Sequence, residues 1–528
     1  MIHIREAQPA DAEAICDIFL ASYGDDYPYA QFRDVQQLTR VIYSDEALVL
    51  VAEDAESGRV LGTASVLLEI GAYADLVGEF GRLAVHPDAR RLGIGKRLME
   101  ERLRRVAGRL HVGVAEARVG HPYSLKIAES HDFHVVGYLP QKMLLAQRES
   151  LVPLMHHFPG ALELRRNHPH VIPEVHAVAH LALENCRLVP DPILDDSSPS
   201  YPQGGEFDLE ELTAEGYAPL LRIERGRVRH REIFGPLRLN YGFFKLKATR
   251  SRYVIAREGG RVAGAVGFTH DPHERTIGVF ELIARDDRVI RVLLSELERR
   301  AREAEDIDYL AADVSAYAPR MQRTLWELGF LPAAYCPALA FHEVERLDII
   351  KMVRLFVPAD PIPDTLSPAS RVMAEAVLRP FGRRAVPPRV AQAVGALGLF
   401  QGLTNEQAEC VASLSRLVAF NPGEILFQEG SPSDKLYVVL SGRIAVLRQD
   451  QLVGAVGPGE CAGELSLLTG APHHATTVAQ GALETVELLH HDLHELIRQR
   501  PDIGVLLCSN LAIDSGRKLL RNSEGGRP

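Results

Sequence analysis

The sequence has no apolar run long enough to cross a membrane, because no uninterrupted stretch among its 528 residues reaches the roughly 18 that a spanning helix needs. Its beginning, MIHIREAQPADAEAI, is interrupted by charged residues from the fifth position onward. That layout does not fit a secretory signal peptide. We therefore expect a cytoplasmic protein without a membrane partner.

Paired cysteines are also lacking. The six cysteines lie far apart, without a CxxC pair, and this disfavours a disulfide framework and a zinc site. We expect buried thiols and no metal. His176 and His180 would share a helix face, but no supporting ligand accompanies them, so we interpret them as surface histidines.

Positive charge is not in excess, because 59 Lys and Arg face 70 Asp and Glu, for a formal net charge of −11. A protein that binds nucleic acid needs a basic face for phosphate contacts. We therefore predict no nucleic-acid partner. A local basic patch stays compatible with this balance.

What the sequence does contain is an internal repeat. The segments ALVLVAEDAESGRVLGTASVLLE (47–69) and RYVIAREGGRVAGAVGFTH (252–270) each predict a β-hairpin, with GRV in both turns. Farther along, 111–140 and 307–337 each read as a strand, a loop with a proline, a helix and a strand. These matches predict two copies of one α/β module.

The repeat and the shifts in composition divide the chain into segments. We expect an α/β module at 1–150, a linker or extension at 151–205, a degenerate copy of the module at 206–345, a proline-rich connector at 346–395, and a small antiparallel β-roll with flanking helices at 396–515.

A basic turn with glycines, HPDARRLGIGKRLM (86–99), connects a predicted strand at 77–85 to a predicted helix. Free backbone N–H groups point outward at a helix start, and the helix dipole adds partial positive charge. Gly93 and Gly95 lie at this start and permit a ligand to approach the backbone. The pattern predicts a site for a diphosphate; a helix start with a solvated basic face is the alternative.

The order of elements over residues 1 to about 145 resembles the GNAT acetyltransferase superfamily, and LAVHPDARRLGIGKRLM is similar to its acyl-CoA-binding motif. The resemblance implies an N-acyltransferase that uses acetyl-CoA and acts on an amine, with a protein lysine preferred as the acceptor and a small amine as the alternative. It assigns the following residues to the coenzyme: Leu83, Val85, Arg90, Arg91, Gly93, Ile94, Gly95 and Lys96.

The resemblance also suggests residues for proton transfer. Glu79 lies at the strand position where histone-type relatives place a glutamate, and it is the candidate base; an ordinary strand-edge carboxylate is the alternative. Ala128 stands where many relatives have the tyrosine that protonates the thiolate. Tyr123 is the candidate substitute acid, and proton donation by water is the alternative.

The second copy departs from this pattern. Its counterpart of the turn, in GVFELIARDDRVIRVLLSEL (278–297), is shorter, and no glycine occurs between Gly278 and Gly329. Asp286 and Asp287 occupy the place of the phosphates, and like charges repel. We expect no CoA there, and we expect the second copy to pack against the first and help to form the acceptor cleft.

The segment GELSLLTGAPHHATTVA (463–479) resembles the phosphate-binding cassette of cyclic-nucleotide-binding domains, and the resemblance extends over 396–515. It implies that Glu464 accepts a hydrogen bond from the ribose. His473, followed by His474, stands where an arginine normally grips the phosphate. Loss of such a charge-assisted bond costs about 1.5 to 3 kcal/mol, or ten- to a hundred-fold in affinity.

The residues implied for the nucleotide are Gly463, Glu464, Leu465, Ser466, His473 and Thr476. The effector implied is cAMP or cGMP. A domain kept for docking or for a different anion is the alternative. A DNA-binding regulator of the cyclic-nucleotide-receptor type has a helix-turn-helix domain after the roll, and the sequence ends at Pro528, so we expect no DNA binding.

Together these features predict an α/β protein with two GNAT-type mixed-sheet modules, the second degenerate, followed by an antiparallel β-roll of the cyclic-nucleotide-binding fold. The predicted function is acyl-CoA-dependent N-acyl transfer under the control of a nucleotide-sensing domain. A non-enzymatic sensor or scaffold that binds acyl-CoA and a cyclic nucleotide and acts through partner proteins is the alternative.

Overall fold

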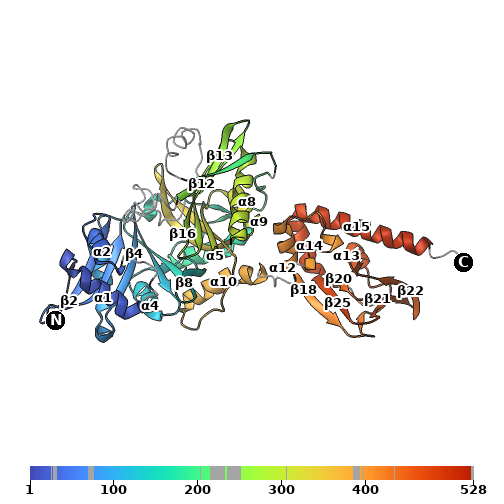
Figure 1. The fold of residues 1–528 in the computed structure, drawn as a ribbon, viewed down its shortest axis with the longest axis horizontal. Helices are drawn as coiled ribbons and strands as arrows, with labels where there is room; N and C mark the ends of the chain where they lie inside the picture. The colour runs from blue at the N-terminus through green and yellow to red at the C-terminus, as the bar shows by residue number, and fades with distance from the viewer. Residues whose placement is uncertain are drawn as a thin grey trace. The chain divides into compact units, whose positions relative to one another are not determined.

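The computed structural model describes residues 1–24, 27, 32–68, 76–202, 204–213, 232–234, 251–304, 306–384, 390, 393–394, 397–432 and 434–524. The chain divides into two compact units, Met1–Arg379 and Pro380–Pro528 (Figure 1). No helix in the described part of the chain combines the length and the apolar character needed to cross a membrane.

The first part of unit 1 is a mixed sheet in the order β1-β2-β3-β4-β5-β8-β6, with β7 paired to β8. Its strands are β1 (Ile2–Glu6), β2 (Ala47–Asp54), β3 (Val60–Leu67), β4 (Val77–Val85), β5 (Val112–Arg118), β6 (His134–Val135), β7 (Leu139–Leu144) and β8 (Arg148–His157). Its helices are α1 (Ala12–Tyr23), α2 (Val35–Ile42), α3 (Ile94–Val106) and α4 (Pro122–Glu129). We call this part the first module. The predicted hairpin and the strand predicted at 77–85 are confirmed.

Strand β4 separates from its neighbour after a short parallel stretch. It pairs with β5 only from Val77 to Glu79, although it continues to Val85. A register shift against β3 marks a bulge in β4, where Arg82 adopts a left-handed φ of 52°. Such a bulge bends a strand, and the result is a wedge between the ends of β4 and β5.

The second module repeats this topology. Its sheet runs in the order β11-β12-β13-β14-β15-β17-β16, and β14 and β15 again form a short parallel pair. Its described strands are β11 (Asp208–Thr213), β12 (Ser251–Glu258), β13 (Arg261–Asp271), β14 (Thr276–Ala284), β15 (Tyr309–Ser315), β16 (Leu331–His342) and β17 (Glu345–Leu355), and its described helices are α8 (Asp287–Glu303) and α9 (Pro319–Glu327). The predicted duplication is therefore present in the fold.

The expected boundaries at 150 and 345 need correction. Strand β8 occupies the start of the expected linker, and β17 occupies the start of the expected connector. Each strand is bonded on both sides within its sheet. Both strands contain consecutive buried residues, which is the pattern of a strand covered on both faces, and the proline and histidine content of the two segments had obscured it. Helix α5 (Pro173–Asn185) and helix α10 (Pro368–Arg384) add regular structure to the same two segments.

The two modules join through their sheet edges. The amide of Tyr138 donates to the carbonyl of Ala333 at 2.8 Å, and the amide of Tyr335 donates to the carbonyl of Val136 at 2.8 Å. A Cβ at Gly137 would clash with Ala334. The close backbone contact shows why a glycine stands there, and the two modules are packed on each other.

A buried ionic network reinforces this junction. The Arg165 guanidinium donates to Asp348 at 2.6 Å and to Asp191 at 2.8 Å. The Asp348 carboxylate is fully buried and also accepts a hydrogen bond from Tyr335 at 2.5 Å. Removal of one partner from such a network leaves an uncompensated buried charge.

Unit 2 contains two antiparallel sheets, in the orders β18-β25-β20-β23 and β19-β24-β21-β22. Its strands are β18 (Ser415–Phe420), β19 (Ile425–Phe427), β20 (Lys435–Ser441), β21 (Ile444–Arg448), β22 (Gln451–Val456), β23 (Cys461–Ala462), β24 (Thr476–Ala479) and β25 (Leu483–Leu489). Its helices include α12 (Asn405–Ser413), α13 (Glu464–Thr469), α14 (His490–Gln499) and α15 (Pro501–Glu524). The predicted β-roll with flanking helices is confirmed.

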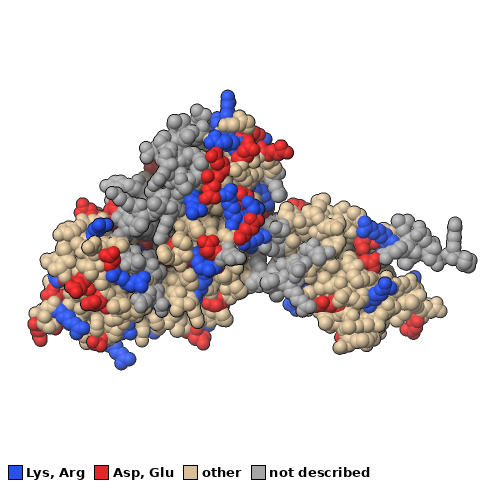
Figure 2. All heavy atoms as spheres, viewed as in Figure 1, with Lys and Arg blue, Asp and Glu red and all other residues tan. Residues whose placement is uncertain are grey.

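Charges of both signs are interspersed on the described surface that Figure 2 shows. On α8, for example, Arg299 and Arg300 both pair with Glu296, at 2.9 and 2.6 Å. Exposed pairs of this kind contribute at most about 1 kcal/mol each to stability. Their main consequence is a surface of mixed charge on this helix.

Candidate functional site

The turn between β4 and α3 is shaped by two left-handed residues. Arg91 has a φ of 69° and Gly93 a φ of 73°. Gly93 is the N-cap of α3, and no side chain supplies a capping hydrogen bond there. A glycine adopts this conformation without steric cost, so the sequence around Gly93 leaves the start of the helix uncapped.

The backbone amides of this turn lack protein acceptors. None of the described residues accepts a hydrogen bond from the N–H groups of Arg91–Lys96. Arg90, Arg91 and Lys96 are exposed beside them. Several uncompensated donors, the positive end of a helix and three cations lie together, an arrangement whose chemistry suits a phosphorylated ligand.

The two glycines of the turn are required for different physical reasons. A Cβ at Gly93 would meet open space, so a glycine is required there by the left-handed backbone conformation and not by close packing. A Cβ at Gly95 would lie 2.8 Å from Cδ1 of Ile127. Gly95 therefore serves the close packing of α3 against α4, and this packing sets the direction in which the free amides point.

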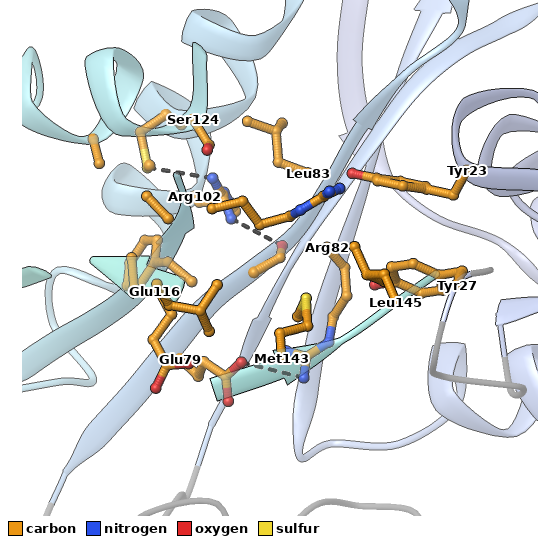
Figure 3. Close-up of a pocket in the computed structure, with 18 residues that line it drawn as sticks. Tyr23, Tyr27, Glu79, Arg82, Leu83, Arg102, Glu116, Ser124, Met143 and Leu145 are labelled. Carbon is orange, nitrogen blue, oxygen red and sulfur yellow. Dashed lines mark hydrogen bonds and ion pairs between the residues drawn. The ribbon is translucent and has the colours of Figure 1, made fainter. Parts of the chain in front are cut away.

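A cavity of about 920 Å³, which includes space open to solvent, fills the wedge between β4 and β5 (Figure 3). Leu83 and Ala128 line it, as does Glu79. Its described lining residues all lie between Tyr23 and Leu151, within the first module and β8. The expectation that the second module helps to form the cleft finds no support in these residues.

The corresponding turn of the second module is built differently. Strand β14 ends at Ala284 and α8 begins at Asp287, so Arg285 and Asp286 alone connect them. The Asp286 side chain caps the helix by accepting from the amide of Arg288 at 2.8 Å. The helix start thus has its own internal anion. That no CoA binds there stays a prediction.

The predicted cassette in unit 2 begins at another uncapped helix start. Gly463 is the N-cap of α13, with a φ of 96° and no side-chain capping bond. Glu464 is buried, and its Oε1 accepts from Nζ of Lys518 on α15 at 2.8 Å. Ser466 is buried and Leu465 is exposed. The carboxylate implied for the ribose is therefore held by a lysine of the last helix.

His473 does not present a cation at this site. Its ring stacks on Phe427 with centroids 3.9 Å apart and is 6% exposed. Burial lowers its pKa, so the neutral form is favoured at pH 7. Thr476 also has a structural task, because its hydroxyl accepts from the amide of Glu429 at 3.0 Å. These contacts differ from the phosphate-gripping role that the resemblance implied for the position of His473.

Family models agree with both of these sites. The model described as acetyltransferase (GNAT) domain matches residues 45–130, and the model described as cyclic nucleotide-binding domain matches residues 417–500. The chain carries a GNAT acetyltransferase domain followed by a cyclic nucleotide-binding domain. The turn and the cavity belong to the former, and the cassette belongs to the latter.

Similar proteins match the cyclic nucleotide-binding domain. The cyclic AMP receptor protein of Thermus thermophilus is 32% identical over 126 residues, which are 23% of this chain and 56% of that protein. A CRP-like cAMP-activated global transcriptional regulator of Mycobacterium tuberculosis is 28% identical over 120 residues, 22% of this chain and 54% of that protein. The chain thus spans about half the length of these relatives.

Among solved structures, a cyclic nucleotide-binding domain from Methylobacillus flagellatus is similar, with 24% identity and a TM-score of 0.24. The match covers 26% of this chain and 80% of that structure.

In the GNAT domain, two carboxylates share the cavity. Glu79 is buried and lies 3.3 Å from the Arg82 guanidinium. Glu116, on β5, lines the same cavity, and Figure 3 shows it near Glu79. Sequence reasoning missed Glu116; its signal was a carboxylate within the alternating strand VGVAEAR.

Two tyrosines of the GNAT domain also line the cavity, and sequence reasoning missed both. Burial raises the pKa of Tyr23 and of Tyr27, so both hydroxyls keep their protons at neutral pH. The predicted acid Tyr123 is 72% exposed, and the structure does not bring it to the cavity, which its neighbour Ser124 lines instead. Tyr123 lies on the exposed side of α4. Its spacing from Ala128, which lines the cavity, does not place the tyrosine side chain in the cavity as well.

Within the described ranges, no group of three or more His, Cys, Asp or Glu side chains is arranged to hold a metal ion. His180 lies 3.3 Å from Glu184, one turn along α5, and His176 lies beside it with ring centroids 5.9 Å apart.

Proposed function

We propose that this chain is an acyl-CoA-dependent N-acyltransferase that transfers an acetyl group to an amine, with a protein lysine as the preferred acceptor. The observation that carries the proposal is the row of uncompensated amides at Arg91–Lys96, in the same module as a cavity lined by carboxylates. Acetyl-CoA supplies an activated acyl group as a thioester when it is bound.

The chain's own groups have distinct tasks in this proposal. The amides of the turn hold the diphosphate, with help from Arg90, Arg91 and Lys96. The edge of β4 beyond Glu79 no longer pairs with β5, so its backbone can bond the extended arm of the coenzyme. This arrangement directs the acyl group into the wedge.

The carboxylates prepare the acceptor. An amine that enters the cavity as an ammonium ion is attracted by Glu79 and Glu116, and the Glu79 carboxylate takes its proton. The nearby Arg82 guanidinium orients that carboxylate at 3.3 Å. A positioned general base of this kind contributes about a hundred- to ten-thousand-fold to the rate.

For the cyclic nucleotide-binding domain we propose a regulatory role with cAMP or cGMP as the effector. A ribose hydroxyl that bonds Glu464 competes with Lys518, which holds this carboxylate at 2.8 Å. Because Lys518 belongs to α15, binding at the cassette and the position of that helix are linked. Transfer rates measured with and without each nucleotide test this role, and equal rates would remove it.

Calorimetry with acetyl-CoA, followed by an assay of free CoA thiol released with amines and proteins, tests the enzymatic proposal. Binding together with acceptor-dependent thiol release supports it. The second candidate is a non-enzymatic sensor or scaffold, which Ala128 in place of a tyrosine and the buried His473 favour. Binding without thiol release for any acceptor would select that alternative.

A further inference from the structure

Arg102 is a buried cation that has no carboxylate partner in the described part of the chain. It lies on α3, is 1% exposed, and lines the cavity of the GNAT domain. Its Nη1 donates to the carbonyls of Ser65 and Gly81, at 3.0 and 3.2 Å. In Figure 3, Arg102 and Ser124 lie toward one end of the cavity, and Glu79 lies toward the other.

The remaining contacts of Arg102 are neutral. Its Nη2 lies 3.3 Å from the sulfur of Met99, and its guanidinium lies 5.4 Å from the centre of the Phe80 ring. Its Nε has no hydrogen-bond partner among the described residues. The neighbouring charge that acts on it is Arg82, which repels it and is itself paired with Glu79.

Burial of the positive charge of Arg102 is energetically unfavourable unless an anion lies beside it. Isolated ions are strongly disfavoured in a protein interior, and buried arginines normally have carboxylate partners. Burial, with repulsion from Arg82, lowers the pKa of Arg102 to about 9, so it stays charged at pH 7. The residues that the structure describes supply two backbone carbonyls and no counter-ion, and the open side of the guanidinium is the cavity.

We propose that Arg102 forms an anion subsite at the end of the cavity, which binds the sulfur of CoA as it becomes a thiolate. The inference rests on the proposed acyl transfer. Ala128, which lines the same cavity, has no group that can donate a proton. Arg102 therefore replaces proton donation by a tyrosine with stabilisation by a fixed positive charge.

The step balances in the following way. The acceptor nitrogen forms a bond to the acyl carbon, and the bond from that carbon to sulfur breaks. The electron pair of the broken bond goes to sulfur. The ammonium nitrogen loses two protons on becoming an amide: the first goes to the Glu79 carboxylate before the attack, and the second goes to solvent water as the amide forms. The thiolate leaves as an anion beside Arg102 and takes a proton from water after release.

Binding of CoA and of desulpho-CoA, which lacks the sulfur, tests the subsite without turnover. A free thiol has a pKa near 8.5, and a neighbouring cation favours its ionised form. We expect the preference of the full chain for CoA over desulpho-CoA, measured by calorimetry, to grow about fivefold between pH 6 and pH 8.5, which is the effect of lowering the thiol pKa by one unit from its free value near 8.5.

Three variants localise the effect. Arg102→Met should abolish the growth of this preference while the affinity for desulpho-CoA is retained, and Arg102→Lys should keep part of it. Arg104→Met is the matched control, because Arg104 lies on the same helix but is exposed and paired with Glu101, and it should behave as the parent chain.

The outcomes separate the two proposals. If neither ligand binds, the proposed function fails. If both bind with a preference that does not change with pH, the subsite fails while the proposed function stands. A preference for acyl groups that carry a carboxylate, without a pH-dependent preference for the sulfur, would also overturn the thiolate assignment; in that case the parent chain would bind succinyl-CoA more tightly than acetyl-CoA.

Discussion

The two α/β modules have the same sheet and different strand-to-helix connections. Both place a short parallel pair at the centre of the sheet, β4 with β5 and β14 with β15. In the first module residues 86–93 form a turn that ends at the uncapped Gly93, whereas in the second Arg285 and Asp286 connect the elements directly and Asp286 caps its own helix. A sheet of this kind therefore forms with either an uncapped or a capped helix start after its central strand.

The cyclic nucleotide-binding domain extends the comparison. Its helix α13 starts at Gly463, which like Gly93 is left-handed and provides no cap. These two helix starts thus have no side-chain cap, whereas Asp286 caps the start of α8. The uncapped and the capped helix starts differ in their N-cap residue, which is a glycine in the former and an aspartate in the latter. Variants at these positions test whether that residue controls ligand binding.

The largest effect is expected at the carboxylates. Glu79 is the third residue of β4 that pairs with β5, and Gly278 is the third residue of β14 that pairs with β15. Only the first module therefore has a carboxylate base at this position. Glu79→Gln should lower kcat/KM about a hundredfold or more because the general base is lost, with unchanged affinity for acetyl-CoA. Glu281→Gln, at a buried glutamate of β14, should leave the rate of transfer unchanged; a loss as large as that of Glu79→Gln would contradict the assignment.

The next effect concerns the turn. Gly93→Val forces a β-branched residue into a φ of 73°, which costs about 1 to 2 kcal/mol, and it displaces the free amides. We expect the affinity for acetyl-CoA, measured by calorimetry, to fall about tenfold or more. Gly259→Val is the control, because Gly259 has a φ of 56° in a hairpin turn of the second module; it should retain acetyl-CoA.

A gain of affinity is expected in the cyclic nucleotide-binding domain. His473→Arg restores a guanidinium beside the uncapped start of α13, and we expect cAMP or cGMP to bind about tenfold more tightly. His474→Arg places the same charge at the exposed neighbour and should change affinity much less. Equal gains in the two variants would mean that general charge, rather than the position of residue 473, controls binding.

The smallest effect belongs to the closed helix start. Asp286→Ala removes the side chain that caps α8 at 2.8 Å, and loss of such a cap costs about 1 kcal/mol of folding free energy. Urea unfolding should show this loss, while acetyl-CoA affinity stays unchanged. A new CoA site in this variant would show that the aspartate alone had excluded the ligand.

Much of the fold was predictable from local patterns. The two hairpins, strand β4 and the strands of the roll follow from alternating apolar residues and from turn residues at regular spacing. The boundaries were wrong because β8 carries a proline and two histidines, and β17 carries charged residues, along with their buried residues. Composition suggested linkers where tertiary packing makes strands.

Only the part of the candidate site that is formed by the backbone of one continuous segment was predictable from the sequence. The turn at 86–93 has its signal in consecutive residues. By contrast, Glu116, Tyr23 and Arg102 come from different elements and line the same cavity. Their local sequences do not predict that these side chains lie close together. The stacking of His473 on Phe427 likewise depends on packing between strands that are distant in sequence.

Backbone hydrogen exchange with and without acetyl-CoA tests the central claim most directly, because it reports on the amides themselves. The account predicts that saturating acetyl-CoA slows exchange at Arg91–Lys96 about tenfold or more, and that the start of α8 at Asp287 is unaffected. Unchanged exchange at Arg91–Lys96 in the presence of bound acetyl-CoA, or protection at the start of α8 instead, would contradict it.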